Sequence, residues 1–553
     1  MYARAMDDPL ATRRAQMFPA MSEAQVARIA PLGVERTFAE GTVVWEQGDA
    51  DVPFYVVLEG ELAVVHPSGP FEDPVVVHGV REFTGESNLL THRRALVRGR
   101  AGKNLRVLEL DHASLRRIIQ NDGELSELVM RAFILRRVAL LARGFGDAVV
   151  IGSSDSAATL RLQAFLHGNG HPYRYLDVDR DHEVQAMLDE FHVGVGDIPI
   201  LICRGAVVLR NPTDAEVADC LGFNQTLTKA RVRDLVICGA GPSGLAAAVY
   251  GASEGLDVLV LEAATPGGQA ASSSKIENYL GFPTGISGEA LGARALAQAE
   301  KFGAELAVAR SATRLRCDET PMRIELANGE SVCARAIVIA TGARYRKLEV
   351  PDLARFEGAG VYYAATAIEA QRCGDDEIVV VGGGNSAGQA ATFLARTARH
   401  VHVLIRGTDL AASMSRYLVR RIEETPNITL RRRTEIVSLD GGDRLERVTW
   451  LDGATGERST RPIRHVFTMA GAVPSTAWLD GCVALDDRGF VLTGREVGAP
   501  ATWPLERSPL LFETSQPRVF AVGDVRASSM KRVASAVGEG SVCVQLVHQV
   551  LAE

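Results

Sequence analysis

The chain has 553 residues, a formal net charge of −8, 46% hydrophobic residues and 23% charged residues. This length exceeds what one hydrophobic core supports, so several domains are expected, and the composition excludes a disordered, collagen-like or disulfide-rich secreted chain. The first residues contain no apolar core of signal-peptide length and no long uncharged run follows, which favours a cytoplasmic protein without a membrane span. The net negative charge argues against a nucleic-acid partner, although three arginines occupy 431–433.

Residues 1–145 are predicted to form a small β-roll followed by a helix. Strand-like runs alternate with glycine turns over residues 35–69, and residues 122–145 have the apolar spacing of an amphipathic helix. This helix is the natural mechanical link to the next domain. Its apolar spacing suits a homodimer seam equally well, so a dimer is expected.

Three segments of this region, EGTVVWEQGD, FYVVLEGELAVV and FTGESNLLTHRRALV, resemble the early strands and the phosphate-binding cassette of cyclic nucleotide-binding domains. The resemblance implies that Gly85 opens the cassette turn, that Glu86 binds a ribose 2′-hydroxyl and that Arg93 binds a cyclic phosphate. The interval from Glu86 to Arg93 is shorter than in that family, and Arg94 stands where a small residue is usual. A cyclic nucleotide is therefore an expected ligand, with a docking or dimerisation domain as the alternative.

Residues 146–228 are predicted to alternate strands and helices in thioredoxin-like order. A strand ends at Gly152, a helix covers 159–167, and the segments YRYLDV, EVQAMLDEF, DIPILIC and AVVLR follow as strand, helix and a strand pair. This pattern resembles thioredoxin and glutaredoxin folds, with Pro199 at the position of their cis-proline. Where those proteins have C-x-x-C, this chain has SSDS; Ser153 and Ser156 are expected to be helix caps, with a catalytic hydroxyl as the alternative.

A dinucleotide-binding fingerprint begins at Asp234. An apolar strand leads into Gly239-x-Gly241-x-x-Gly244, an alanine-rich helix follows, and the next strand ends in Glu262. The glycines allow a pyrophosphate to approach the helix N-terminus, and the terminal carboxylate is placed to bind ribose hydroxyls.

A second fingerprint begins at Glu377, with Gly382-x-Gly384-x-x-Ala387 between a strand and a helix. The strand after that helix ends at Arg406 rather than at an acid, and an arginine there accepts a 2′-phosphate, which favours NADPH over NADH. The alternative is that Arg406 is a solvated residue at a strand end. Two dinucleotide sites in one chain indicate an electron relay.

Together with the segments PGGQAASSSKIENYLGFP, IATGA and VFAVGDVRASSMKRVASAVGEGSVCVQ, these motifs resemble the low-molecular-weight thioredoxin reductases over residues 232–553. The resemblance implies an FAD domain split around an inserted NADPH domain, with the two rotating against each other. Asp524 is expected to accept a ribityl hydroxyl, or else to be a helix N-cap. By the resemblance and the fingerprints, the residues expected to contact FAD are Gly239, Gly241, Ser243, Gly244, Glu262, Gly268, Gln269, Asn278, Ala340, Gly342, Gly523, Asp524, Arg532 and Val533. The residues expected to contact NADPH are Gly382, Gly384, Asn385, Ser386, Ala387 and Arg406.

The redox cysteine pair of that family is replaced here by alanines. Thioredoxin reductases have C-x-x-C just before the NADPH glycine loop, whereas this chain has AATA, with Ala364 and Ala367 at the two cysteine positions. Alanine forms no thiolate, so disulfide reduction through this site is excluded. None of the eight cysteines is at C-x-x-C or zinc-ligand spacing, so neither a disulfide framework nor a metal site is predicted; Cys373 is a conceivable replacement thiol, but a small core residue is the better interpretation.

The expected architecture is multidomain: a cyclic nucleotide-binding-like β-roll (1–145), a degenerate thioredoxin-like α/β domain (146–228) and two Rossmann-like domains, with the FAD domain at 229–350 and 469–553 and the NAD(P)H domain at 351–468. The function expected is an NADPH-dependent FAD oxidoreductase of thioredoxin reductase type that passes electrons to a small-molecule or protein acceptor other than a built-in disulfide. One alternative is a thioredoxin-pathway enzyme that uses an external disulfide or a displaced cysteine. Another is a signalling protein in which a degenerate reductase module senses redox state and the front domain adds a nucleotide input.

Overall fold

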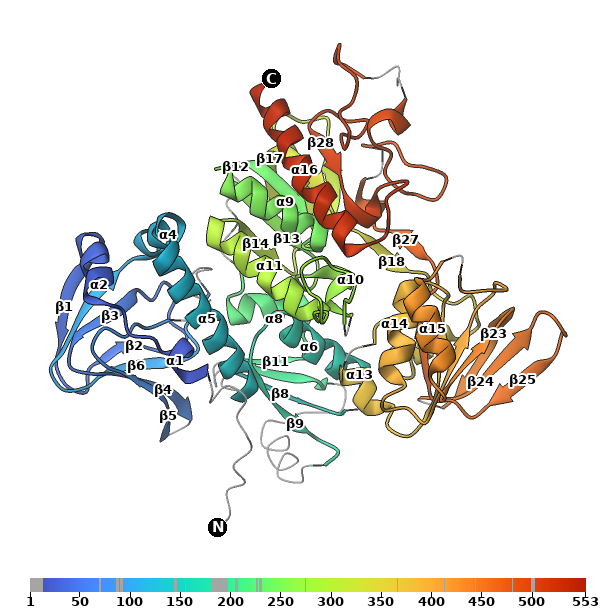
Figure 1. The fold of residues 1–553 in the computed structure, drawn as a ribbon, viewed down its shortest axis with the longest axis horizontal. Coiled ribbons are helices and arrows are strands. Elements are labelled where there is room, and N and C mark those ends of the chain that lie inside the picture. The colour runs from blue at the N-terminus through green and yellow to red at the C-terminus, as the bar shows by residue number, and fades with distance from the viewer. Residues whose placement is uncertain are drawn as a thin grey trace. The chain divides into compact units, whose positions relative to one another are not determined.

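The computed structural model describes residues 13–68, 71–85, 89, 93–143, 147–154, 156–180, 197–203, 207–224, 227, 231–273, 275–365, 367–411, 413–442, 444–479, 481–498 and 503–553 (Figure 1). The chain forms two compact units. One comprises Met1–Ser154, Arg161–Leu227 and Ala297–Ala309, and the other comprises Asp155–Leu160, Thr228–Leu296 and Arg310–Glu553.

The first part of the first unit is the predicted β-roll. One antiparallel sheet has the order β1 (Val34–Phe38), β7 (Leu105–Leu110) and β3 (Phe54–Glu59), and a second has the order β2 (Val43–Trp45), β6 (Arg98–Ala101), β4 (Leu62–Ser68) and β5 (Phe71–His78). The helices are α1 (Arg14–Met17), α2 (Glu23–Ile29), α4 (His112–Asn121) and α5 (Gly123–Arg143). Helix α2 begins with a capping box in which Ser22 and Gln25 bond reciprocally. The core packs three aromatic rings, Phe54, Phe83 and Phe133, at centroid distances of 5.5 to 6.5 Å, so the predicted roll and helix are confirmed.

Most apolar residues of helix α5 pack against other residues of the same chain. Leu125, Val129, Ala132 and Phe133 are buried in the core of the β-roll. The homodimer seam suggested by the sequence is therefore largely covered, and only Ile134 and Val138 remain as large exposed apolar residues on this helix among the described residues.

The second part of the first unit has a mixed four-stranded sheet with the order β11 (Val207–Arg210), β10 (Ile200–Cys203), β8 (Ala148–Gly152) and β9 (Tyr173–Asp177). Strand β8 runs parallel to β9 and antiparallel to β10. Helix α8 (Asp214–Leu221) and helix α6 (Ala157–Gly168) from Arg161 onward complete the part that is described. The bond between Ile198 and Pro199 is cis, as expected of a thioredoxin-like domain; the helix predicted at 183–191 lies outside the described residues. Strand β14 (Glu305–Val308) also belongs to this unit.

The second unit contains the two predicted Rossmann-like domains. In the FAD-type sheet, β12 (Val232–Cys238) pairs in parallel with β13 (Val258–Glu262) and β17 (Ser331–Ile339), and β28 (Val519–Ala521) pairs in parallel with β17. Strands β16 (Met322–Leu326) and β15 (Ala312–Arg316) continue the sheet antiparallel. Its helices are α9 (Pro242–Ser253), α10 (Gly268–Ala271) and α16 (Val533–Ala552), with 3-10 turns η4 (Ala477–Leu479), η5 (Gly494–Val497) and η6 (Gly523–Val525). Helix α11 (Gly288–Phe302) begins in this unit, and its residues from Ala297 onward are counted with the first unit.

The inserted domain has an all-parallel sheet with the order β19 (Val361–Tyr362), β26 (His465–Thr468), β20 (Glu377–Val381), β21 (His400–Leu404) and β22 (Ile428–Arg431). Helices α12 (Leu353–Phe356), α13 (Ala367–Arg372), α14 (Asn385–Leu394) and α15 (Arg416–Glu424) belong to it, as does an antiparallel sheet of β23 (Thr434–Gly441), β24 (Leu445–Asp452) and β25 (Arg458–Arg461). Two antiparallel strands, β18 (Ala343–Tyr345) and β27 (Ala472–Pro474), connect the two domains.

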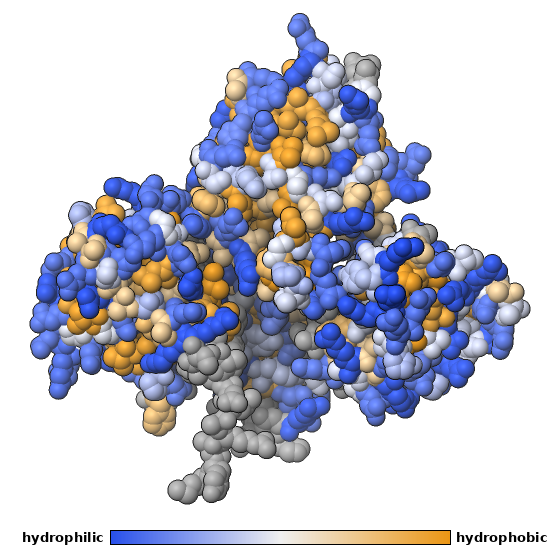
Figure 2. Space-filling view, in the orientation of Figure 1, coloured by the Kyte–Doolittle hydropathy of each residue, from blue (hydrophilic) through white to orange (hydrophobic). Residues whose placement is uncertain are grey.

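Polar residues dominate the surface seen in Figure 2, where apolar residues form smaller scattered clusters. Within the part of the chain that is described, no helix combines the length and the apolar character needed to cross a membrane.

Candidate functional site

The first glycine loop forms an open cradle at the start of α9. A Cβ atom on Gly239 would lie 2.3 Å from the Ala340 carbonyl oxygen, and one on Gly244 would lie 1.9 Å from the Gly239 carbonyl oxygen, so both positions require glycine for close packing. At Gly241, by contrast, the nearest atom to such a Cβ is the Cα of Gly268 at 4.0 Å. Helix α9 begins there without a side-chain cap, so its first amides are available to a phosphate.

Glu262 holds this loop through two backbone hydrogen bonds. Its Oε2 accepts from the Ala240 amide at 2.7 Å and its Oε1 accepts from the Ala264 amide at 2.9 Å. Burial raises the pKa of this carboxyl, and the bonds from Ala264 and Ala240 act in the opposite direction. The Ala263 amide also bonds this carboxylate, and because its two oxygens together have about four acceptor sites, it retains capacity for a ribose hydroxyl.

The late FAD motif lies against the same helix. A Cβ on Gly523 would meet the Ser243 Oγ at 2.5 Å, which places η6 next to the start of α9. The Gly523 amide donates to Glu539 Oε2 at 2.7 Å, and Arg526 pairs with the same carboxylate at 2.7 Å. Glu539 thus positions a predicted cofactor residue, and no motif spacing in the sequence indicated it.

Asp524 and the start of α16 form another wall of the cradle. Burial raises the pKa of the Asp524 carboxyl, while the charge of Lys531 opposes that shift. Helix α16 begins at Val533, and Arg532 at its N-cap position makes no side-chain cap. Two uncapped helix ends, the space at Gly241 and the carboxylate of Glu262 therefore fit a dinucleotide such as FAD.

The remaining predicted FAD residues have mixed surroundings. The side-chain amide of Gln269 donates to the Ala343 carbonyl on β18. Ala340 is buried, Asn278 is exposed, and Gly342, at φ 63°, has no atom within 4 Å of an added Cβ. Gly268, at φ 56°, lies against Gly241.

The second glycine loop repeats the geometry at the start of α14. Gly382 has φ 143°, and a Cβ there would lie 2.7 Å from the Met469 carbonyl oxygen, whereas Gly384 has no atom within 4 Å of an added Cβ and starts α14 without a side-chain cap. Asn385 Oδ1 accepts from the Ser415 amide at 2.7 Å. Ser386 bonds the Tyr345 hydroxyl, a contact that lowers the pKa of Tyr345 against the larger raising effect of burial. The buried Ala387 packs near Gly382.

Arg406 is exposed, two residues after β21 ends. This is the edge of the sheet where the carboxyl ends of parallel strands meet. A nucleotide bound at Gly384 places its ribose near that edge in this fold class.

The alanine pair lies where the inserted sheet meets α13. Ala364 is half-buried, and Ala367 is the first residue of α13. Next to Ala364, the Tyr363 hydroxyl donates to Glu357 Oε1 at 2.5 Å. Burial raises the pKa of Tyr363, and this hydrogen bond raises it further. Cys373 is fully buried, and burial raises the pKa of its thiol to about 12. Such a thiol is inert, so Cys373 does not replace the missing pair.

The serine pair of the thioredoxin-like domain is engaged locally. Ser153 Oγ donates to Asp179 Oδ2 at 2.6 Å, and Ser156 Oγ accepts from the Thr159 amide at 3.4 Å at the start of α6. The Ser156 contact has the geometry of a helix N-cap.

The β-roll contains a partly open cavity of about 260 Å³. Most of its lining is apolar, and Arg93 and Arg136 are among the polar residues that reach it. Arg136 is buried and donates to the carbonyl oxygens of Met17, Phe83 and Gly85 at 2.7, 3.0 and 2.9 Å. Burial lowers the pKa of this guanidinium to about 9. Arg136 on α5 thus ties that helix to Gly85, where the predicted cassette begins; Glu86 lies outside the described residues.

Arg93 also contacts the thioredoxin-like domain. Its Nη1 donates to the Asn169 carbonyl oxygen at 3.1 Å, and its guanidinium lies 4.9 Å from the centroid of the Phe223 ring. One arginine therefore both lines the cavity and contacts the neighbouring domain, a link between distant segments that the sequence did not reveal.

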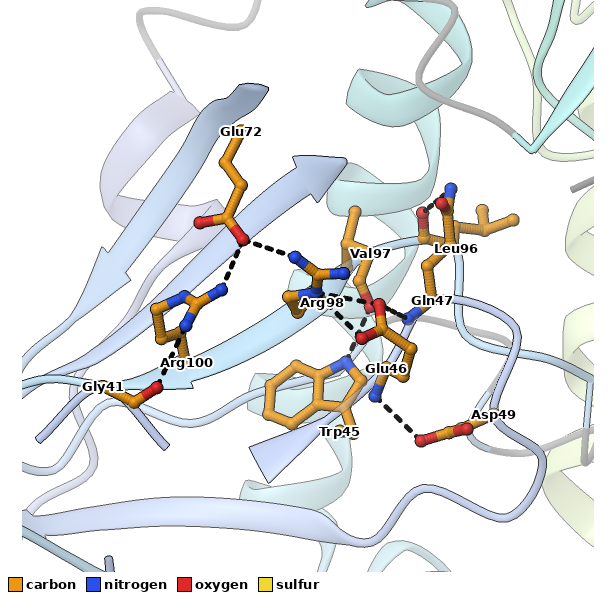
Figure 3. Close-up of polar contacts among 10 residues, drawn as sticks. All are labelled: Gly41, Trp45, Glu46, Gln47, Asp49, Glu72, Leu96, Val97, Arg98 and Arg100. Carbon is orange, nitrogen blue, oxygen red and sulfur yellow. Dashed lines mark hydrogen bonds and ion pairs between the residues drawn. The ribbon is translucent and has the colours of Figure 1, made fainter. Parts of the chain in front are cut away.

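The polar contacts on the outer strands of the roll are shown in Figure 3. Arg98 bonds Glu46 at 2.8 Å and Glu72 at 2.5 Å, and Arg100 bonds Glu72 at 2.6 Å. Trp45 Nε1 donates to the Val97 carbonyl at 2.8 Å. These charged groups pair with one another across strands, so they indicate a structural network rather than a ligand site.

A disulfide joins Cys317 to Cys482, 165 positions apart. The spacing of the cysteines gave no indication of this pair. The other six cysteines, Cys203, Cys220, Cys238, Cys333, Cys373 and Cys543, lie outside this disulfide. No group of three or more metal-ligating side chains occurs in the described ranges.

Comparison with known proteins agrees with this geometry. Residues 233–540 match the family model described as pyridine nucleotide-disulphide oxidoreductase, and residues 35–122 match the one described as cyclic nucleotide-binding domain. A thioredoxin reductase of Mycolicibacterium smegmatis is 35% identical over 314 residues, which cover 57% of this chain and 94% of that protein. Since the first match spans more than half of the chain, the chain belongs to the pyridine nucleotide-disulphide oxidoreductase family.

Solved structures place it more narrowly. The Lactococcus lactis thioredoxin reductase in its FR conformation aligns with a TM-score of 0.52 and 28% identity, covering 58% of this chain and 99% of that one. The T. acidophilum thioredoxin reductase aligns with the same TM-score and 27% identity, covering 58% and 100%. The second unit is therefore a thioredoxin reductase-like oxidoreductase module, preceded in the chain by a cyclic nucleotide-binding domain fold.

Proposed function

We propose that this protein is an NADPH-dependent FAD oxidoreductase that delivers electrons to an acceptor other than a disulfide within its own chain. The observation that supports this most is the contrast between two open glycine loops, at Gly241 and Gly384, and the alanines at 364 and 367. The proposed domains are the β-roll at 1–145, the thioredoxin-like domain at 146–228, the FAD domain at 229–350 and 469–553, and the NAD(P)H domain at 351–468. When bound, FAD would accept a hydride from NADPH and pass electrons onward.

The chain's own residues would bind and orient the two nucleotides. Gly241 and the amides of α9 would bind the FAD pyrophosphate, Glu262 the ribose, and the region of Gly523 and Asp524 the ribityl chain. Gly384 and the start of α14 would bind the NADPH pyrophosphate, and Arg406 the 2′-phosphate. Half-buried Ala364 would leave the space of a thiol to an external acceptor such as a quinone or an iron–sulfur protein.

Anaerobic absorbance spectroscopy tests the proposal. The purified protein is expected to be yellow, and NADPH is expected to bleach its flavin band under argon. A colourless protein that takes up no FAD, or a fully flavinated protein that NADPH leaves unchanged, would contradict it.

Disulfide reduction distinguishes the proposal from a thioredoxin-pathway enzyme. Reduction of thioredoxin or of a dithiobenzoate reagent with NADPH is expected to be slow and insensitive to prior thiol alkylation, because no accessible dithiol lies at the family position. Fast turnover that alkylation abolishes would instead favour the thioredoxin-pathway alternative, which is consistent with the names of the relatives.

The Arg406→Ala variant tests the choice of nucleotide. Removal of a guanidinium that binds a 2′-phosphate is expected to lower kcat/KM for NADPH about tenfold while leaving kcat/KM for NADH nearly unchanged. Arg399→Ala is the control. It removes an arginine directly before β21 that pairs with Glu377 at 3.4 Å and is not predicted to bind the nucleotide. An equal loss for both nucleotides would assign Arg406 a structural role only.

We further propose that the β-roll regulates the reductase by binding a small anion-bearing ligand, with a cyclic nucleotide as the first candidate. The support is the cavity of about 260 Å³ and the position of Arg93, which lines it and also contacts Asn169 and Phe223. A phosphate that drew Arg93 toward the cavity would compete with these contacts, so binding would alter how the thioredoxin-like domain is held.

Thermal unfolding with cyclic AMP and cyclic GMP tests this regulatory role. Either nucleotide at 100 times its Kd is expected to stabilise the protein by about 2.7 kcal/mol, and Arg93→Ala is expected to abolish the shift. The Arg36→Ala variant, in which an exposed arginine of β1 is removed, is the matched control. If neither nucleotide shifts the unfolding temperature at millimolar concentration, the β-roll is a docking module. We also propose that the protein is a homodimer, which sedimentation analysis tests.

A further inference from the structure

The disulfide between Cys317 and Cys482 joins the two sequence halves of the FAD-type domain. Cys317 directly follows β15, before the inserted domain, and Cys482 follows η4 by three residues, after it. The bridge therefore closes a loop that contains the whole NADPH-type domain. Within the described residues it is the sole disulfide.

Strand register separates this bridge from the predicted flavin. Arg316, the residue before Cys317, is aligned with Arg323 of β16, which is aligned with Cys333 of β17. Cys333 precedes Thr341, in the predicted flavin motif, by eight residues. At about 3.3 Å per residue, roughly 25 Å of strand lies between them, so the bridge is not positioned to replace the missing C-x-x-C.

The segment 475–482 connects the bridge to the flavin motif. At its beginning, the Ser475 amide donates to the Gly342 carbonyl at 3.1 Å, and Thr341 Oγ1 donates to the Ser475 carbonyl at 2.8 Å. In its middle, the buried Trp478 and Leu479 lie in η4, and Trp478 Nε1 also donates to the Ser475 carbonyl at 3.2 Å. At its end, the disulfide fixes Cys482. The segment is thus held at both ends, and strand β27, one of the two connections between the domains, immediately precedes it.

Both bridged cysteines retain some exposed surface, so a reductant is expected to reach them. Cys317 and Cys482 are half-buried, whereas Cys203, Cys238, Cys373 and Cys543 are buried. Cys333 is also half-buried, so it can serve as an internal reference for thiol reactivity.

We propose that Cys317 and Cys482 form a redox-responsive clasp that fastens segment 475–482 to the FAD-type sheet. A dithiol reductant opens it: the Cys317–Cys482 sulfur–sulfur bond breaks, two electrons and two protons pass to the two sulfurs, and the reductant leaves as its own disulfide. Opening frees one end of the segment and so weakens the hold of Ser475 on Thr341 and Gly342. The effect on flavin retention rests on the proposed function, but the clasp itself does not.

Peptide mapping and thermal unfolding of the full chain test the clasp. After blocking of accessible thiols with N-ethylmaleimide, a cross-linked peptide pair containing Cys317 and Cys482 is expected, while Cys333 is labelled. Dithiothreitol followed by iodoacetamide should then label both bridged residues. Reduction is expected to lower Tm by at least about 3 °C, because the closed loop is long, and to increase the fraction of FAD released on dilution.

Matched variants identify the bond responsible. The Cys317→Ser/Cys482→Ser double variant should resemble the reduced protein and show no Tm response to dithiothreitol, whereas Cys333→Ser should respond as the wild type does. Labelling of Cys317 and Cys482 without reduction, or an unchanged Tm response in the double variant, would overturn the proposal. A protein that contains no FAD but shows the cross-link and the thermal response would contradict the proposed function and leave the clasp intact.

Discussion

Glu72 illustrates how single charges of the β-roll are held, and it gives a prediction that depends on pH. Bonds from Arg100 and then Arg98 lower the pKa of Glu72. Because the folded state depresses this pKa, the stabilisation is present at neutral pH and is lost as the pH falls through the folded value. Glu72→Gln is expected to destabilise the β-roll by less than about 1 kcal/mol at pH 7, since the three side chains are partly exposed.

Chemical denaturation of Glu72→Gln and wild type at pH 7 and pH 3 measures this effect. The difference between them should shrink at pH 3 and in high salt. Glu61→Gln, at an exposed glutamate beside β4, is the control and should unfold like the wild type. A difference that persists unchanged at pH 3 would show that the ion pairs are not its cause.

His402 should make the inserted domain sensitive to acid. Its side chain is buried, and burial lowers its pKa from 6.5 to about 4; Arg431 and His400 act in the same direction, and the Glu377 carboxylate, 3.4 Å away, opposes them. The unfolded chain takes up a proton below pH 6.5 while the folded chain does not. The free energy of unfolding should therefore fall between pH 6.5 and 4, by at most about 3 kcal/mol, and show no further loss from this group below that range.

The variant His402→Gln isolates that contribution. It should flatten the pH dependence between 6.5 and 4 in denaturant titrations followed by tryptophan fluorescence, to which Trp450 contributes with its ring 5.4 Å from that of His402. His400→Gln replaces a half-buried histidine on the same strand and should keep most of the slope. Equal slopes in wild type and His402→Gln would assign the acid sensitivity to other groups.

Elements formed by local pattern were predictable from the sequence, and links between distant segments were not. Glycine spacing, apolar periodicity and a terminal acid indicated β12, α9 and β13 because each signal lies within about 30 residues. The pairing of Cys317 with Cys482 and the contact of Arg93 with Phe223 depend on how separate elements pack, which no spacing rule encodes. Glu539 is only 16 positions from Gly523, but its bond to the Gly523 amide depends on how α16 packs beside η6, which the sequence pattern does not encode.

Cysteines restored at the start of helix α13 test whether the alanines there removed a redox-active thiol pair. Ala364 precedes the helix and Ala367 is its first residue, and a helix N-terminus lowers the pKa of a nearby thiol. In the double variant Ala364→Cys/Ala367→Cys, NADPH is expected to produce two additional thiols that iodoacetamide labels under argon. The corresponding serine variant is the control. Failure of NADPH to reduce a disulfide formed there, in a protein whose flavin it does bleach, would indicate that this segment has been reshaped for another acceptor.

The β-roll and the inserted domain have different clusters of buried residues, so the unfolding of the two units should be separable. Leu110 is fully buried in the β-roll of the first unit, and Ile378 is fully buried in the inserted domain of the second. Leu110→Ala and Ile378→Ala should each cost about 2 to 5 kcal/mol, and in differential scanning calorimetry each should lower a different transition. FAD and NADP⁺ should raise only the transition that Ile378→Ala lowers, because a ligand stabilises the cooperative unit that binds it. A single transition, lowered equally by both variants and raised by either nucleotide, would mean instead that the two units unfold as one, and that a ligand in the β-roll acts on the stability of the whole reductase.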